Sequence, residues 1–222
     1  MNEFMYLMPG NWFELKTINS NKTYPYDLEM LKTEILNQVN NRAEHLSFIN
    51  NTNWLQKSTN AKIVDITFHL DKHKFNTMAK ILSTQKRHPV ITFHGTSSFD
   101  VVESILKHGY IIPGITNNKT DIVVKKANGS VYGIGVYSSP FFDKANCYTR
   151  PDKNGYVYIL INMLFIGVAK LVSGSKDIDH KAPINGRYSD GTASRIVYGL
   201  DQIISADPTN IVPIAVMKIS IR

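Results

Sequence analysis

Apolar and polar residues follow different patterns in two parts of the chain. Residues 1–60 are polar and rich in asparagine, and residues 26–46 carry a helical pattern. The apolar positions on one stripe of this helix are Leu28, Leu31, Ile35, Val39 and Leu46. Because an apolar stripe must be covered, we expect residues 1–60 to form a helical extension that docks on residues 61–222.

From residue 61 onward, short apolar runs rich in β-branched residues predict strands. The expected strands cover residues 62–70, 89–95, 132–139, 155–172, 200–206 and 211–221. Residues 71–84 fit either a short helix or a loop, and residues 141–148 fit a helical turn. Helices lie between strands early in the chain and strands dominate later, which predicts an α+β fold with split or mixed sheets and flanking helices.

One further helix is expected at residues 97–109. A serine supplies its N-cap, and Gly109 ends it. Its expected buried stripe consists of Phe99, Val102, Ile105 and Leu106.

Charge and cysteine content narrow the classes of partner. The 222 residues include 25 Lys and Arg against 18 Asp and Glu, a net charge of +7 that suits anionic partners but is scattered along the chain. A single cysteine, Cys147, excludes an internal disulfide framework and favours a reducing compartment, so we expect an intracellular protein, cytoplasmic or nuclear. No apolar run reaches the length of a membrane span, and we expect no membrane partner.

Two short segments carry candidate chemistry. "FHGT" at 93–96 ends an expected strand with a histidine and a glycine, whose backbone a planar ligand can approach closely. "YGIGVYSSP" at 132–140 places Tyr137 at the end of another strand, and Tyr148 follows after a helical turn. Two tyrosines and a histidine near glycines fit a site for an aromatic ring with an amide, although each residue alone also fits a structural role.

Two other patterns are set aside. His69 and His73 have helical spacing, but the pattern around them is that of a strand and no glutamate follows, so we expect no metal site. The glycines at 133 and 135 lack the third glycine of a dinucleotide-binding fingerprint.

Taken in order, four segments resemble the catalytic domain of the poly(ADP-ribose) polymerase (PARP) family, the diphtheria-toxin-like ADP-ribosyltransferases. They are "FHGT", "VVESILKHGYIIPG", "YGIGVYSSPFFDKANCY" and "LDQIISADPTNIVPIAVMKI". The resemblance covers residues 61–222. It implies the ADP-ribosyltransferase fold in that range and NAD as co-substrate.

The resemblance also implies roles for individual residues. His94 would contact a ribose hydroxyl, the Gly95 backbone would bind the nicotinamide carboxamide, and Tyr137 and Tyr148 would enclose the nicotinamide ring. Aromatic stacking and carboxamide hydrogen bonds would orient a ring whose departure leaves an oxocarbenium-like ribose. The expected catalytic residues are His94, Tyr137 and Gln202. The expected NAD-binding residues are His94, Gly95, Thr96, Tyr137, Ser138, Ala145 and Tyr148.

Two departures from the family pattern bear on turnover. Ala145 stands where family members often have a serine that bonds the carboxamide, which removes a hydrogen bond worth about 0.5–1.5 kcal/mol. Gln202 stands where the family usually has glutamate, and an amide holds a hydroxyl but takes no proton. Asp201 is the alternative carboxylate, although a one-residue slip would turn every side chain of that strand to its other face.

The leading hypothesis is therefore a mono-ADP-ribosyltransferase, with a protein acceptor expected and a nucleic-acid end as the alternative. A catalytically silent NAD- or ADP-ribose-binding module is the second hypothesis, and RNA 2′-phosphate transfer to NAD is a third. Residues 114–130 occupy the place of the family's donor loop, where Lys119, Lys125 or Lys126 would approach the pyrophosphate, against the alternative of a solvated basic loop. Residues 173–199 suit a rim near the acceptor, where Arg187 and Arg195 are the residues to test.

Overall fold

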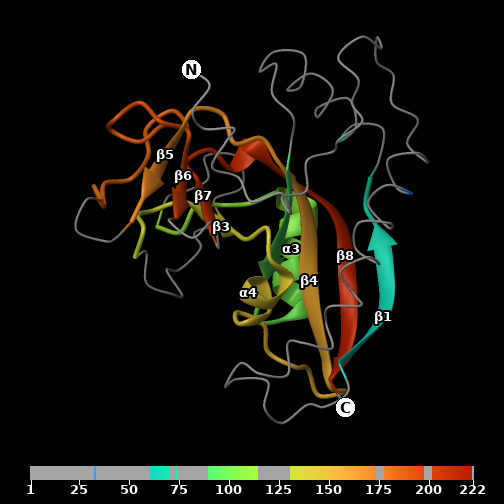
Figure 1. Cartoon of the computed structure of the whole chain (residues 1–222). Coiled ribbons are helices and arrows are strands. Elements are labelled where there is room, and N and C mark those ends of the chain that lie inside the picture. The colour runs from blue at the N-terminus through green and yellow to red at the C-terminus, as the bar shows by residue number, and fades with distance from the viewer. Residues whose placement is uncertain are drawn as a thin grey trace.

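Two four-stranded sheets form the described part of the chain. The computed structural model describes residues 61–70, 90–114, 131–173, 178–197 and 202–221, together with Thr33 and Lys74. The first sheet has the order β1-β8-β4-β2 and is antiparallel throughout. Its strands are β1 (Ala61–Phe68), β8 (Ile211–Ile221), β4 (Tyr156–Leu164) and β2 (Val90–Gly95). Figure 1 shows β4 and β8 side by side as the longest strands of the molecule's described part.

The second sheet is shorter and mixed. Its order is β3-β7-β6-β5, and only the β5–β6 pair is parallel. Its strands are β3 (Val136–Ser138), β7 (Ile203–Ser205), β6 (Ser194–Val197) and β5 (Ala169–Val172). In Figure 1 it lies beside the upper part of the first sheet. The described architecture is thus mixed helix and sheet, mostly sheet, as the sequence predicted.

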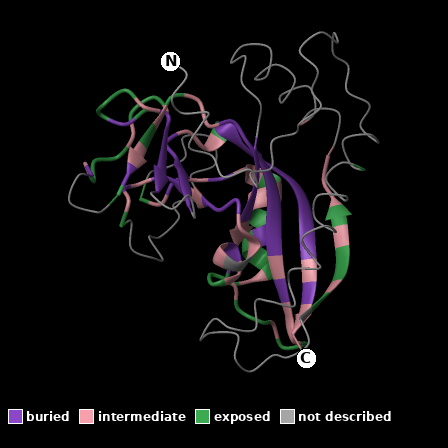
Figure 2. Cartoon of the chain, in the orientation of Figure 1, coloured by how far each residue is buried: buried purple, intermediate pink, exposed green. Residues whose placement is uncertain are grey.

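The two sheets share a core with the longer helix, α3 (Phe99–His108). Leu160 and Val216 contribute from the first sheet, Ile203 from the second, and Val102 from α3, all buried. Figure 2 shows buried residues along β4 and β8 and through the second sheet, whereas edge strand β1 carries several exposed positions. Burial of these apolar side chains is the main force that holds the two sheets together.

The opposite face of the first sheet carries a second apolar cluster. It includes Phe93, Ile159, Ile161 and Met217, all almost fully buried. The short helix α4 (Phe142–Asn146) packs on this face, where the Phe142 ring meets the Phe93 ring edge-on with centroids 6.1 Å apart. Helices α3 and α4 therefore lie on opposite faces of the first sheet.

A single backbone bridge joins β2 to the residue that follows β3. The Phe93 N–H donates to the Ser139 carbonyl (2.6 Å), and the Ser139 N–H donates to the Phe93 carbonyl (2.9 Å). This bridge links the two sheets directly beside His94 and Tyr137, and we refer to it as the seam.

Most expected elements are present, with three corrections. Residues 155–172 form two strands in different sheets, β4 and β5, because the chain turns at residues 165–168. Strand β6 was not expected, since it lies in a polar, glycine-rich stretch. Phe99 is 41% exposed and leans on the Tyr158 ring (centroids 4.7 Å apart), because the first turn of α3 extends past the shared core.

Several expectations concern residues outside the described ranges. They concern the helix expected at 26–46, of which only Thr33 is described, and the segment 71–84, of which only Lys74 is described. They also concern four single residues, Lys119, Lys125, Lys126 and Asp201. Thr33 itself is helical and exposed. In the described ranges, no helix combines the length and the apolar character that a bilayer crossing requires.

Candidate active site

The seam places the histidine of β2 against the tyrosine of β3. The Nδ1 of His94 lies 2.7 Å from the backbone carbonyl oxygen of Tyr137. Because a carbonyl only accepts, Nδ1 must carry the hydrogen and donate it. Burial lowers the pKa of His94 below its ordinary value, and the hydrogen bond to Tyr137 opposes this only in part. The imidazole is therefore neutral near pH 7, with Nε2 left as an acceptor.

A buried polar pair supports His94 from the other side. The ring of Tyr110 meets the imidazole edge-on, with centroids 5.1 Å apart. The Tyr110 hydroxyl donates to Oδ1 of Asn162 (2.7 Å), which stands at a register shift in the otherwise apolar β4. Burial raises the pKa of Tyr110, so its hydroxyl stays protonated and the pair stays intact. Tyr110 and Asn162 thus fix the imidazole ring.

Two hydrogen bonds hold the hydroxyl of Tyr137. Its hydroxyl donates to the Gly133 carbonyl (2.7 Å) and accepts a hydrogen bond from the Tyr132 N–H (3.0 Å). Burial raises the pKa of Tyr137 to about 12. Its phenol is therefore no acid or base at neutral pH, and its role is that of a ring fixed in place.

Tyr148 reaches the same region from helix α4. Its N–H donates to the Ala145 carbonyl (3.1 Å), and its side chain is 42% exposed. The same Ala145 carbonyl lies where a Cβ of Gly95 would stand, so the turn that carries Tyr148 adjoins the residue after His94. We call His94, Tyr137 and Tyr148 the His–Tyr cluster.

Gly95 is the contact point between β2 and helix α4. A Cβ built on Gly95 would collide with the Ala145 carbonyl oxygen, and it would lie 3.0 Å from Cγ2 of Thr149. Glycine is therefore required here by close approach of two backbones. Through this contact the position of Gly95 determines how far α4, and with it Tyr148, lies from β2.

Gln202 lies on the same face of the second sheet as Tyr137. Tyr137 pairs with Ile204, and residues two apart on a strand share a face, so Gln202 and Tyr137 project to the same side. The side chain of Gln202 is buried, and its backbone carbonyl accepts from the Val197 N–H (3.0 Å). The choice of Gln202 as the third polar residue of the site stays a prediction.

The side chains of two expected NAD-binding residues, Thr96 and Ser138, do not point toward the His–Tyr cluster. The Thr96 hydroxyl donates to the Ser98 carbonyl (3.0 Å) at the start of α3. Ser138 adjoins Tyr137 on β3, so its side chain points to the opposite face, where Oγ is buried without a hydrogen-bond partner in the described part of the chain. Any contact of these residues with a ligand at the His–Tyr cluster would use their backbones.

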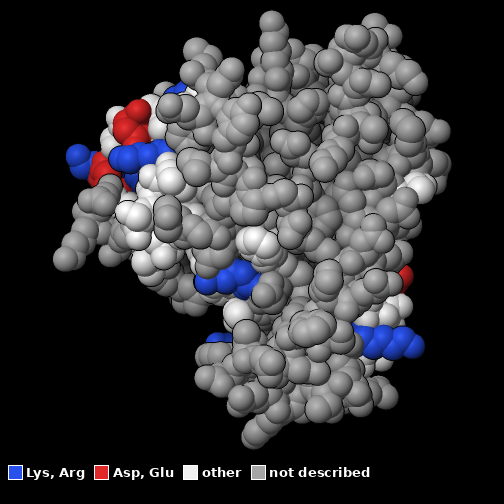
Figure 3. Space-filling view, viewed as in Figure 1, with Lys and Arg blue, Asp and Glu red and all other residues white. Residues whose placement is uncertain are grey.

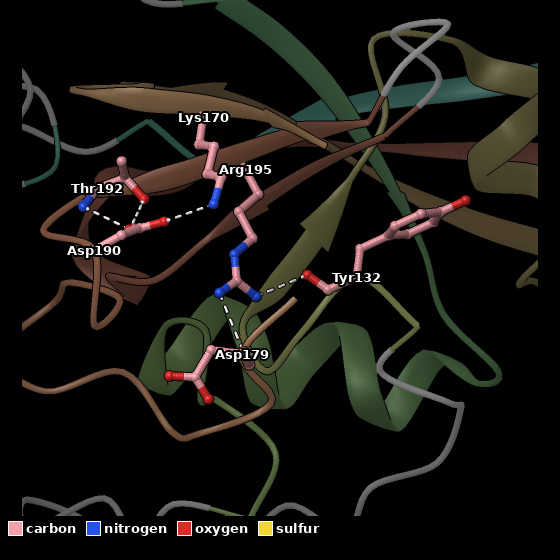
Figure 4. Close-up of polar contacts among 6 residues, drawn as sticks. All are labelled: Tyr132, Lys170, Asp179, Asp190, Thr192 and Arg195. Atoms are coloured by element: carbon pink, nitrogen blue, oxygen red, sulfur yellow. Dashed lines mark hydrogen bonds and ion pairs between the residues drawn. The ribbon is translucent and has the colours of Figure 1, made fainter. Parts of the chain in front are cut away.

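Arg187 and Arg195, both in the loop expected to form the acceptor rim, differ in their exposure to solvent. Arg187 is exposed and donates to the Gly191 carbonyl (2.8 Å). Arg195 is 2% exposed, so it is no rim residue. Figure 4 shows its guanidinium between the backbone carbonyls of Tyr132 and Asp179, to which it donates at 3.1 Å each.

The described charges do not gather into one basic patch on the face shown in Figure 3. Lys and Arg side chains stand apart from one another there, with acidic side chains next to the basic ones over the second sheet. The ion pair between Lys170 and Asp190 (3.4 Å), where Asp190 also accepts from Thr192, is one such place (Figure 4).

Comparisons with known proteins give a partial match. No family model matches the chain. The chain is similar to the poly(ADP-ribose) polymerase tankyrase of Caenorhabditis elegans, with 29% identity over 97 residues, which is 40% of this chain and 4% of the relative. This distant similarity points to a PARP-like relationship.

Proposed function

We propose that the chain is an NAD-dependent mono-ADP-ribosyltransferase, with the ADP-ribosyltransferase fold over residues 61–222. The observation that supports this proposal is the His–Tyr cluster, in which Nδ1 of His94 bonds the backbone carbonyl of Tyr137 and the turn that carries Tyr148 lies against Gly95. The partial similarity to a poly(ADP-ribose) polymerase supports it. So does the four-segment resemblance of the sequence to that family.

The residues present fit the nicotinamide half of NAD. The rings of Tyr137 and Tyr148 suit a flat heteroaromatic ring, and the close contact of Gly95 with Ala145 keeps the turn that carries Tyr148 next to β2. Nε2 of neutral His94 accepts a hydrogen bond, so it binds a hydroxyl donor such as that of a ribose. NAD supplies an activated glycosidic bond whose leaving group is nicotinamide.

Gln202 limits the chemistry that follows. Its amide can accept from and donate to hydroxyl groups, but it cannot take a proton from an incoming nucleophile. A second ribose would need such activation, so we propose transfer of a single ADP-ribose unit. A protein side chain is the proposed acceptor, a nucleic-acid end is the alternative, and the proposed compartment is cytoplasm or nucleus.

Transfer of label from isotopically labelled NAD to proteins of a cell lysate tests the proposal. His94→Ala and Tyr137→Ala should each abolish transfer. His69→Ala and Tyr156→Ala are matched controls, because His69 follows β1, which lies at the edge of the first sheet opposite β2, and Tyr156 contacts Lys218 at the far end of β4. An absence of label with wild type, or label that both site variants leave unchanged, would contradict the proposal.

A catalytically silent NAD- or ADP-ribose-binding module is the second candidate. The observation that favours it is the absence of a carboxylate at Gln202, together with Ala145 in place of a hydroxyl residue. Two measurements distinguish the transferase from the silent module: NAD binding by thermal shift, and release of nicotinamide over hours. Binding without release supports the silent module, and release supports the transferase.

A further inference from the structure

Arg195 is a buried cation whose hydrogen bonds end on backbone carbonyls. It lies on β6, is 2% exposed, and donates from Nη1 to Tyr132 and from Nη2 to Asp179. Its guanidinium lies over the Tyr188 ring, 3.8 Å from the centroid. Burying a charge costs free energy unless it is well bonded, so a neutral side chain would serve better if only packing mattered.

The carbonyl that Arg195 binds belongs to the residue that holds Tyr137. Tyr132 accepts from Arg195 through its carbonyl and donates through its N–H to the Tyr137 hydroxyl. Gly133, the next residue, accepts from that same hydroxyl. Tyr132 and Gly133 thus form a corner that receives Arg195 on one side and the tip of Tyr137 on the other.

The guanidinium of Arg195 occupies the space where a side chain at position 133 would begin. Its φ of +102° is a conformation that L residues rarely adopt, and a Cβ there would collide with Nη1 of Arg195. The shape of the corner and the position of the guanidinium are therefore mutually dependent. Figure 4 shows that the same guanidinium also reaches Asp179, at the start of the described part of the expected acceptor loop.

We propose that Arg195 is a positioning residue that sets the orientation of the Tyr137 ring through the Tyr132–Gly133 corner, and that it ties the loop around Asp179 to that ring. This inference rests on the proposed function in one respect, namely that NAD is the ligand that Tyr137 contacts. Lysine cannot replace arginine in this role, because one ammonium cannot reproduce a planar fork that bonds two carbonyls while stacking on a ring.

A double-mutant cycle on the full chain tests this route, with NAD affinity measured by calorimetry. Arg195→Met keeps the aliphatic stem and removes the donors, and Tyr137→Phe removes only the hydroxyl. Each should weaken NAD binding about tenfold, and the double variant should be little weaker than either, because both changes break the same chain of contacts. Additive losses would overturn the proposal, since a general packing role predicts additivity.

Chemical rescue adds a readout that loss of packing would not show. In Arg195→Ala, methylguanidinium should restore NAD affinity, whereas methylammonium at the same concentration should not. Arg195→Lys should behave like Arg195→Met. Equal rescue by the two cations, or full affinity in Arg195→Lys, would contradict the positioning role.

Hydrogen exchange at the Tyr132 amide separates this proposal from the proposed function. That N–H donates to the Tyr137 hydroxyl, so Arg195→Met should accelerate its exchange without any ligand. If wild type binds no NAD, the proposed function fails, and faster exchange would still support the role of Arg195 on Tyr137. Unchanged exchange would overturn that role whatever NAD does.

Two glycine variants cover the case in which the Arg195 variants do not fold. Gly133→Ala forces the guanidinium away from the corner, whereas Gly191→Ala, at φ +81° with open space around it, introduces comparable backbone strain and no collision. Gly133→Ala should accelerate Tyr132 amide exchange and Gly191→Ala should not. Equal effects of the two would overturn the proposal.

Discussion

The ring of His94 is buried and donates from Nδ1, so its protonation makes the free energy of unfolding depend on pH. Burial lowers the folded-state pKa of His94 below its ordinary value near 6.5, so the unfolded chain binds this proton at higher pH than the folded one. The contribution to stability is complete above about pH 6.5 and is lost as pH falls toward the folded pKa. His69, whose pKa burial also lowers, adds to the same slope.

We therefore expect His94→Gln to flatten the dependence of unfolding free energy on pH between about 7 and 5. Urea unfolding at several pH values measures this. His69→Gln serves for comparison and should remove a separate part of the slope. A slope that stays unchanged in His94→Gln would mean that the ring is not held neutral by its surroundings.

Gly95→Ala should destabilise the protein by about 1–3 kcal/mol, because the new methyl group meets a backbone carbonyl that cannot move without α4. The helix and Tyr148 should shift away from β2. Nuclear magnetic resonance shifts of residues 142–148, together with denaturant unfolding, test both effects. Unperturbed shifts at α4 would contradict the close approach seen here.

The sequence predicts the roles of some single residues better than those of others. His94 and Tyr137 could be singled out because each stands in a recognisable motif at an expected strand, and the structure places the His94 ring against the Tyr137 backbone. Arg195 could not be placed, since one arginine in a polar stretch gives no signal of burial. Asn162 did leave a signal, as a polar residue inside the apolar run "YILINMLF", but its partner Tyr110 is 52 residues away in the chain.

At the scale of elements, the orientation of α3 can be tested with two adjacent valines. Val102 is fully buried between the sheets, whereas Val101 is 40% exposed. Val102→Ala should cost about 2 kcal/mol of unfolding free energy, and Val101→Ala should stay within about 0.5 kcal/mol. Chemical denaturation of both variants gives the comparison. Similar losses in the two would mean that α3 is rotated from the orientation described.

Strands were predictable where their apolar pattern was long and bounded by turn residues. Strand β8 covers residues 211–221 as expected, and β2 differs from expectation by one residue at its start. The run at 155–172 was read as continuous because the pattern of side chains does not reveal which sheet a strand joins. Strand β6 was missed because three of its neighbours in sequence, Asp190, Gly191 and Thr192, are typical of turns.

At the scale of the whole molecule, one apolar face of the first sheet raises the question of what covers it. Phe93, Ile161 and Met217 on that face are almost fully buried, and among the described elements α4 packs there. The stripe expected at residues 26–46 is a suitable partner in composition. Thr33, which is helical and exposed, stands two residues from Leu31 and from Ile35 in the sequence, a spacing that puts it off the expected stripe.

We expect Ile35→Asp to lower the unfolding free energy of the full chain by at least about 1.5 kcal/mol, because docking of the expected stripe would bury Ile35 and a charge there would be costly. Binding of a hydrophobic dye should rise at the same time. Thr33→Asp is the matched control and should change neither quantity. Equal behaviour of the two variants would contradict docking of this helix.

The seam between Phe93 and Ser139 consists of two backbone hydrogen bonds, which place no demand on the identity of any side chain. Substitutions at positions of β2 and β3 other than Gly95 can therefore accumulate while the backbones of Phe93 and Ser139 keep their spacing. A single inserted or deleted residue in either strand would displace one partner by about 3.3 Å and turn it to the other face. Over evolutionary time, the lengths of these two strands should vary far less than their composition.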